Sequence, residues 1–491
     1  MTLSCLFLCK NRVRKNYSWV IHVVAAAVVL PFVTLATYSH PFFDDYGTAL
    51  EIKRTGFTYY YTSLYQNWTG RYAFLLANMM HPLRFGGLRA YQFTAGVLVM
   101  GLVGSCYGLS WSLTTGLPLR QANRLALGSG LVVAMLALLP SPAEGFYWVV
   151  GGYNYLLPIM VGFGGLAAGC GYAATLGRPH WQWLLLAGIF GSAALFPGFS
   201  EFSACLSLLV AGSSLIAFPR ASWLYRGAAV VSVVGAVVML AAPGNLGRLQ
   251  QHPHEWHLFR AAGLALGATG YTLLNWLGFP TFWVLAGLGL PLWEQLAAGT
   301  GPVAQLARRP LLWPFLMIGG LLGCYFFSYL TLQQPLPLRA RNLLYAYFLV
   351  TGIFGLVGAV QLAQRRGKSL PRLPPAILSI LLIISLLSDG NGRLRGDAIG
   401  RGYNTVGQAY HDWLSGDARR FDAAERSRYA LLRTTTADSV AVPPLPVMPA
   451  TLFYFDIGPS PGLWGNLHLA HYFGKKAVWV QWEKPPRKQQ K

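Results

Sequence analysis

Charged residues are scarce in this 491-residue chain: Asp, Glu, Lys and Arg make up 11% of it, against 54% hydrophobic residues. Soluble domains contain roughly 25% charged residues, so the composition excludes an ordinary soluble protein. Apolar runs long enough to cross a hydrocarbon core about 30 Å thick recur along the sequence. We therefore predict an all-α polytopic membrane protein, because a helix satisfies its own backbone polar groups inside a bilayer.

Cysteines and repeats are also few. Of the six cysteines, four lie inside apolar runs (Cys106, Cys170, Cys205 and Cys324), and their spacing gives neither a zinc site nor a disulfide framework. The sequence shows no internal repeat, and its one low-complexity segment is the terminal KPPRKQQK. Many transporters are built from repeated halves, so this absence counts against transport.

The basic residues predict the topology. The formal net charge of +22 is carried mostly by short loops between apolar runs, a pattern typical of orientation in a bilayer rather than of nucleic-acid binding. We expect a retained first span, a cytoplasmic N-terminus and a tail 389–491 outside. About eleven spans are expected, near 18–38, 89–113, 125–141, 154–177, 181–197, 199–218, 222–242, 258–291, 311–330, 341–362 and 373–388. The segment 258–291 is either one span kinked near Pro280 or two short ones.

Acidic residues are rarer still within the predicted transmembrane domain 1–388. Seven occur before residue 389, and six of them fall on the outer side in this topology: Asp44, Asp45, Glu51, Glu144, Glu201 and Glu255. Ionisable residues near a membrane are costly unless they are used or solvated. Their one-sidedness indicates one outward-facing polar site built from several loops.

The centre of this expected site is Asp44 and Asp45, which stand where the chain leaves the first span and enters the outer loop 39–88. A carboxylate in such a place can act as a general base, and its neighbour can orient a sugar or a metal. Asp44 is the preferred base because it is nearer the membrane exit; if the segment is extended, Asp45 points to the opposite side. The structural alternative for the pair is a turn or helix cap.

Outer arginines and aromatic residues complete the expected site. Arg71, Arg248, Arg339 and Arg341 run against the positive-inside bias; they suit the oxygens of a phosphate, although snorkelling to headgroups is the alternative. Aromatic side chains suit sugar faces but also suit an interfacial belt. The further candidate substrate-binding residues are Tyr46, Trp68, Trp148, Asn154, Tyr155, Glu201 and Asn245.

The tail 389–491 is long enough for a small α/β domain. Residues 403–433 form an amphipathic helical pattern, residues 442–449 a Pro-rich linker, and the runs 451–457 and 476–482 are predicted strands around a turn-rich segment.

Several segments resemble a known family. The Asp-Asp pair after the first span, NWTGR at 67–71, FYWVVGGYNYLLP, APGN with Arg248, PLRAR, and FDIGPSPGLWGNLHLAHYFG in the tail resemble the GT-C glycosyltransferases, near their bacterial GtrII-like branch. The resemblance covers most of the chain in order. It implies a GT-C-like fold, the inner membrane of a bacterium as the location, a polyprenyl-phosphate-linked sugar as donor, a first-loop aspartate as base, and outer arginines that hold the carrier phosphate.

The sequence thus predicts a glycosyltransferase that moves a sugar from a polyprenyl-phosphate carrier to a surface glycan, lipid or protein. A polysaccharide polymerase or ligase, and a transporter or flippase of lipid-linked sugars, are the alternatives. The sugar, the acceptor and a requirement for Mg²⁺ or Mn²⁺ are left open.

Overall fold

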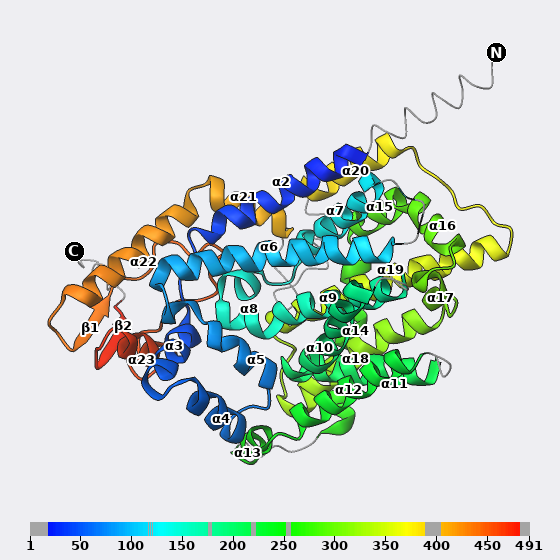
Figure 1. Ribbon diagram of the computed structural model, residues 1–491. Helices are drawn as coiled ribbons and strands as arrows, with labels where there is room; N and C mark the ends of the chain where they lie inside the picture. The colour runs from blue at the N-terminus through cyan, green and yellow to red at the C-terminus, as the bar shows by residue number, and fades with distance from the viewer. Residues whose placement is uncertain are drawn as a thin grey trace.

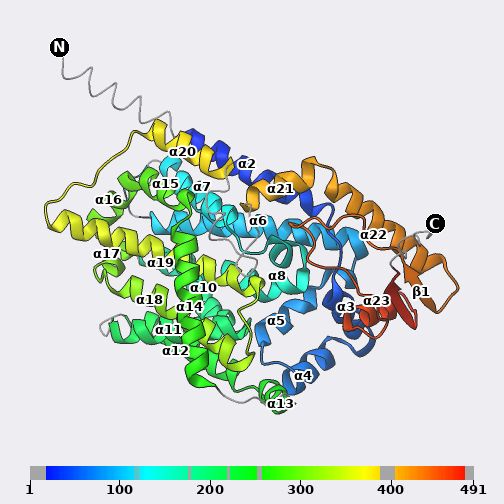
Figure 2. The same ribbon diagram turned by 180° about the vertical axis from the view of Figure 1, so that it is seen from behind.

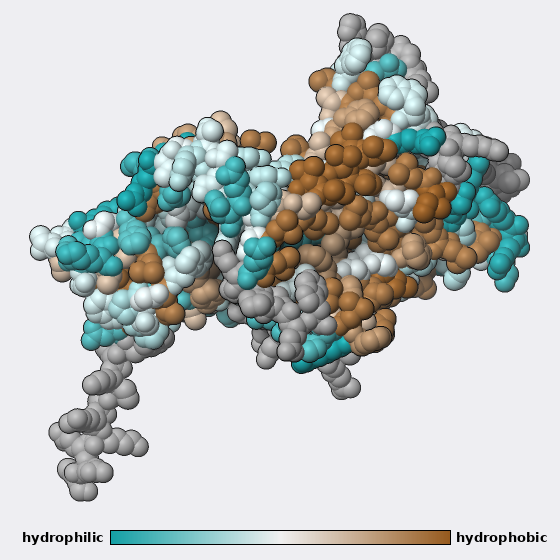
Figure 3. Space-filling model, turned by 90° about the horizontal axis from the view of Figure 1, so that it is seen from below, coloured by the Kyte–Doolittle hydropathy of each residue, from teal (hydrophilic) through white to brown (hydrophobic). Residues whose placement is uncertain are grey.

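The computed structural model describes residues 18–115, 117, 119, 121–174, 179–217, 222–251, 257–387 and 404–481. Seven helical segments of this part are long and apolar enough to cross a membrane, and two shorter apolar helices accompany them. The apolar surface gathers over the helical bundle, whereas the opposite end of the molecule is largely hydrophilic (Figure 3). These helices fit a multi-pass all-α membrane protein, as predicted; the count of eleven spans stays a prediction.

The long helices run alongside one another as a bundle (Figures 1 and 2). They are α2 (Ser18–Ala36), α6 (Gly87–Leu113), α7 (Gln121–Ala137), α9 (Leu157–Ala174), α10 (Pro179–Leu195), α11 (Glu201–Ala217), α12 (Trp223–Leu240), α14 (Leu258–Leu277), α18 (Leu312–Thr331), α19 (Leu338–Arg365) and α20 (Pro375–Leu387). α19 is the most enclosed of these apolar segments. Its residues Leu344, Phe348 and Val357 are fully buried in the core.

Short helices fill the connections. They are α15 (Pro280–Leu288), α16 (Leu290–Ala298), α17 (Pro302–Ala307), α8 (Val149–Tyr155), η3 (Ala143–Tyr147), η4 (Phe196–Gly198) and α13 (Pro243–Gln251). The segment 258–291 is broken into α14, α15 and the start of α16, and α15 begins at Pro280. The break follows from chemistry, since proline has no N–H to continue a helix but suits a first helical position.

The predicted outer loop 39–88 is helical and caps one end of the bundle. It contains α3 (Phe43–Thr55), α4 (Phe57–Asn67), α5 (Tyr72–Ala77), η1 (Asn78–Met80) and η2 (Pro82–Arg84). Between α3 and α4 the chain turns at Gly56, whose φ of 81° is a conformation that favours glycine. The first loop is therefore a folded layer that holds its polar residues in fixed places.

Residues 404–481, here called the C-terminal unit, pack onto that layer beside α3 (Figures 1 and 2). The unit contains α21 (Thr405–Leu414), α22 (Asp417–Thr434), β1 (Ser439–Val442), α23 (Trp464–Tyr472) and β2 (Ala477–Val480). The predicted single helix over 403–433 is two helices, because the chain turns at Gly416 with φ 80°.

One of the two predicted strands is wrong. β2 lies within 476–482 as expected, but its parallel partner is β1, whereas 451–457 is not a strand. Residues 451–457 instead pack aromatic rings against the first loop: Phe453 lies 5.0 Å from Phe42 and Phe455 lies 4.6 Å from Phe43, between ring centroids. A run of aromatic residues satisfies strand propensity and side-chain packing equally well.

Candidate functional site

Asp44 and Asp45 lie in the first turn of α3, directly beyond the end of α2. The segment is helical rather than extended, so the two side chains diverge by about 100° instead of alternating between two faces. Acidic residues in a first helical turn are stabilised by the unpaired N–H groups there. The alternative that the pair is a structural helix cap therefore applies to one of the two residues, Asp45.

The side chain of Asp45 is fully buried, and its two oxygens accept four hydrogen bonds. Oδ2 accepts from the Phe42 N–H at 2.8 Å and the Tyr91 hydroxyl at 2.6 Å. Oδ1 accepts from the Val150 N–H at 3.1 Å and lies 3.2 Å from His81 Nε2. A carboxylate so occupied joins α3 to α6 and α8, and it has no oxygen left for a substrate.

Asp44 differs from its neighbour. It is half-buried, and its Oδ1 atom is enclosed without a hydrogen-bond partner among the described residues. Burial, and then the nearby charge of Asp45, raise the pKa of Asp44 to about 7, although Arg339 and Arg71 act in the opposite direction. A carboxyl group with a pKa near neutrality and an oxygen without a hydrogen-bond partner among the described residues has the properties of a general base.

A first ion-pair group lies next to Asp44. Glu201, at the start of α11, is 5% exposed and bridges two arginines. Its Oε2 atom accepts from Arg71 Nη2 at 2.8 Å and its Oε1 atom accepts from Arg248 Nη2 at 2.9 Å. With the Asn154 amide oxygen turned toward it, Arg71 Nη1 also donates to Asn154 at 2.7 Å. Residues from four distant segments are thus joined.

The segment before Arg71 is held by close backbone packing. A Cβ atom on Gly70 would lie 2.1 Å from the carbonyl oxygen of Met239, so no larger residue fits without a shift. Asn245 is buried and braces this contact: its oxygen accepts from the Gly70 N–H at 3.1 Å and its amide donates to the Met239 carbonyl at 2.7 Å. Asn245 therefore positions Arg71, rather than facing a ligand itself.

A second ion pair contains Arg339, whose charge also acts on the pKa of Asp44. Arg339 Nη1 donates to Glu144 Oε1 at 2.8 Å, and the Arg339 guanidinium carbon lies 5.4 Å from the Trp148 ring centroid and 5.9 Å from that of Tyr155. Glu144 sits in η3, a π-helix of five residues. π-Helical turns are uncommon and are frequent at functional sites.

These groups form one electrostatic unit, here called the acid–arginine cluster: Asp44, Arg71, Glu144, Glu201, Arg248 and Arg339. Both Arg71 and Arg339 act on the pKa of Asp44, and Arg339 in turn acts on Arg71. Three buried atoms at the cluster have no hydrogen-bond partner among the described residues: Asp44 Oδ1, Glu144 Oε2 and Trp148 Nε1. Buried polar atoms are nearly always paired, so these three are candidate ligand contacts.

The structure places two of the candidate residues, Tyr46 and Arg341, away from the cluster and a third, Trp68, at its edge. Tyr46 is buried against the C-terminal unit, where its hydroxyl lies 2.9 Å from that of Tyr429. Arg341 is 4% exposed and its Nε donates to the Leu336 carbonyl at 2.9 Å, whereas Arg339 keeps 29% of its side chain exposed. Trp68 is exposed at the edge of the cluster, and the guanidinium carbon of Arg248 lies 5.8 Å from its ring centroid.

Sequence reasoning missed the contribution of the C-terminal unit. Tyr454 interacts with Arg339 and Glu144, and His40 holds the unit to the first loop through Asp422 Oδ1 at 2.9 Å and the Tyr429 hydroxyl at 3.1 Å. Glu144 was visible among the outer acids, but no local pattern pairs it with Arg339, which is 195 residues away.

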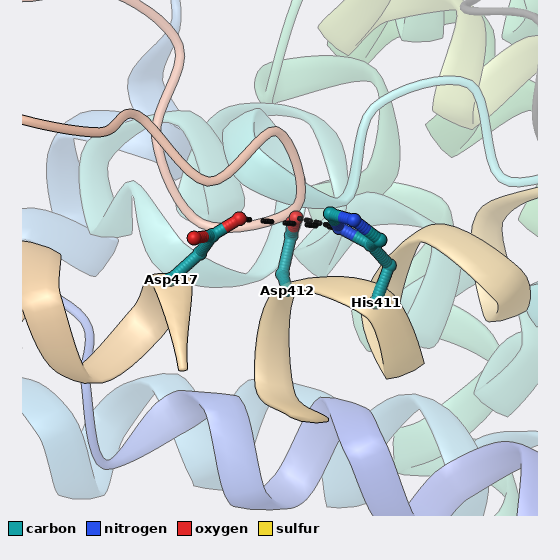
Figure 4. Close-up of side chains that lie close together, drawn as sticks. All are labelled: His411, Asp412 and Asp417. Atoms are coloured by element: carbon teal, nitrogen blue, oxygen red, sulfur yellow. Dashed lines mark ion pairs between the residues drawn. The ribbon is translucent and has the colours of Figure 1, made fainter. Parts of the chain in front are cut away.

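Among the described residues, three possible metal ligands converge at one place: His411, Asp412 and Asp417, at the turn between α21 and α22 (Figure 4). This place is not the acid–arginine cluster. Asp412 is already used as a brace, since Oδ1 accepts from Gln408 at 2.8 Å and Oδ2 from the Thr451 N–H at 2.7 Å. Among the described residues, no group of oxygen or nitrogen ligands suited to Mg²⁺ or Mn²⁺ converges beside Asp44.

No family model matches this chain, and no characterised protein or solved structure matches it.

Proposed function

We propose that the protein is a membrane glycosyltransferase that uses a lipid-linked phosphosugar as donor. The observation that carries the proposal is the state of Asp44: a half-buried carboxyl with a pKa near 7 and an oxygen without a hydrogen-bond partner among the described residues, within the electrostatic reach of two arginines at the end of an apolar helical bundle. The acyl chain of the donor would lie against the bundle, and its phosphate would lie beside the arginines.

Arg339 is the best-placed phosphate ligand of the cluster. An arginine has five N–H donors, and Arg339 donates to Glu144 and also interacts with the hydroxyls of Tyr155 and Tyr454, while its side chain stays 29% exposed. Arg71 is less available, because Nε and Nη2 face Glu201 and Nη1 faces Asn154. A guanidinium over aromatic rings is also held in a fixed plane, which suits a bidentate phosphate contact.

The reaction would proceed by direct displacement. Asp44 accepts the proton of the acceptor hydroxyl, whose oxygen then forms a bond to the anomeric carbon of the donor. The bond between that carbon and the phosphate oxygen breaks, and its electron pair stays on the phosphate, where Arg339 stabilises the added charge. One displacement inverts the anomeric configuration.

The test uses purified full-length protein and a panel of radiolabelled polyprenyl-phosphate sugars, with label transfer or release of the free polyprenyl phosphate as readout. We expect one donor to be consumed by the wild type and not by Asp44→Asn. Glu51→Gln is the matched control, because Glu51 is an exposed acid on the same helix. Equal turnover in Asp44→Asn and wild type would refute Asp44 as the base, and movement of intact donor across vesicles would indicate a flippase.

A further inference from the structure

A second polar feature lies at the far end of α3, away from the acid–arginine cluster. Leu50, Lys53 and Arg54 of α3 face His471, Gly474 and Lys475, from the end of α23 and the turn after it, across an open cavity of about 580 Å³. This feature is here called the basic cavity. No acidic residue lines it.

The charges of the basic cavity are not neutralised from within. Lys53 and Arg54 are exposed and form no ion pair with a described residue, and Lys475 uses one donor on the Thr435 carbonyl at 2.6 Å. Lys476, the next residue, is paired with Asp438 at 2.6 Å and does not line the cavity. The dipole of α3 favours cations in its last turn, but it does not explain why Lys475 faces them from another element.

The position of the basic cavity indicates its ligand. Lys53 follows Asp44 by nine residues on one helix, which corresponds to about 14 Å along the helix axis and about half a turn around it, so a ligand that reaches both must also pass around α3. α23 is packed tightly on α3, since a Cβ atom on Gly47 would clash with the His468 ring, so the two elements form one rigid rim. α3 and α23 lie at the hydrophilic end of the molecule, beyond the apolar helices (Figures 1 and 3). A ligand would therefore arrive from the aqueous side rather than from the bilayer.

We propose that the basic cavity binds an anionic group of the acceptor, a phosphorylated or carboxylated glycan whose reactive hydroxyl reaches Asp44. The proposal rests on the function proposed above and specifies its acceptor. Such a glycan would be extended, with its negative charge more than about 14 Å from the hydroxyl that is glycosylated, because the path also passes around the helix. Lys53 and Arg54 would set this specificity without taking part in the reaction.

The test measures binding separately from transfer. Fluorescein-labelled oligogalacturonate serves as the carboxylated probe, its methyl ester as the neutral probe, and inorganic pyrophosphate as a phosphate competitor, with full-length protein in nanodiscs of neutral lipid. We expect Lys53→Gln/Arg54→Gln to weaken binding of the acidic oligomer by about fivefold to tenfold, since exposed charge contacts are individually modest. Lys476→Gln is the matched control, because Lys476 is an exposed cation outside the cavity; it should bind like wild type.

Three results would overturn the proposal: unchanged affinity in the double variant, equal weakening in Lys476→Gln, or equal binding of the neutral oligomer. Nanodiscs that contain anionic lipid provide a further arm, and loss of oligomer binding there would assign the cavity to headgroups instead. Asp44→Asn should bind the oligomer normally. Binding in that variant separates failure of the basic cavity from failure of the proposed catalysis.

Discussion

Asp44→Asn and Asp45→Asn should fail in opposite ways, although the two residues are neighbours. Asp45 accepts four hydrogen bonds, and the single carbonyl oxygen of an asparagine can keep about two of them. Hydrogen bonds to a charged group contribute roughly 1.5–3 kcal/mol each, so the loss is about 3–6 kcal/mol. Proteins are stable by about 5–15 kcal/mol. Asp45→Asn should therefore lower the apparent melting temperature strongly or prevent folding.

Asp44→Asn should fold and lose turnover. Because the pKa of Asp44 is raised to about 7 in the folded protein, its ionisation costs stability, and that cost grows as the pH rises from about 4 to about 7. Removing the charge should thus keep or raise the melting temperature near pH 7. Loss of a general base lowers the rate by about 10²- to 10⁴-fold.

The assay pairs thermal melting of purified protein, followed by size-exclusion fluorescence, with initial rates on the donor identified above. Glu51→Gln controls for loss of a carboxylate on α3. An Asp45→Asn protein that melts like wild type but is inactive, together with a fully active Asp44→Asn protein, would refute the assignment of the two roles.

Three further predictions follow from the cluster. The kcat/KM of the wild type should rise with pH around an apparent pKa of about 7 as Asp44 ionises. Arg339→Gln should move that rise to higher pH by about one unit, because a nearby cation has been removed. An unshifted profile would show that Arg339 does not act on the ionisation of Asp44. Arg339→Lys should raise the KM for the donor, since a lysine does not reproduce a bidentate contact. Arg341→Lys should instead lower the melting temperature with little change in KM. The reverse pattern would exchange the roles of the two arginines. Glu201→Gln should destabilise the protein by about 3–5 kcal/mol, the usual effect of removing one partner of a buried ion pair, and a melting curve like that of wild type would show that the Arg71 bridge is dispensable.

The class of the fold could be predicted from the sequence, and so could a set of charged residues that the structure later shows in contact. Long apolar runs permit little but helices in a bilayer, and scarce acids in such a chain stand out because each is costly. Asp44 and Glu201 were selected on this ground, and Arg71, Arg248 and Arg339 because they run against the positive-inside bias; the structure brings the five together in one cluster.

Tertiary structure decided which member of each similar pair faces the cluster. Asp44 and Asp45 are alike in sequence, and so are Arg339 and Arg341; helix phase and the donors on α6 and α8 bury Asp45, while packing buries Arg341. The ion pair of Arg339 with Glu144 joins residues far apart in the chain, and no local pattern contains such a contact. The position of the C-terminal unit on α3 likewise depends on aromatic packing between distant segments, because side-chain complementarity is a property of two surfaces and not of either sequence run alone.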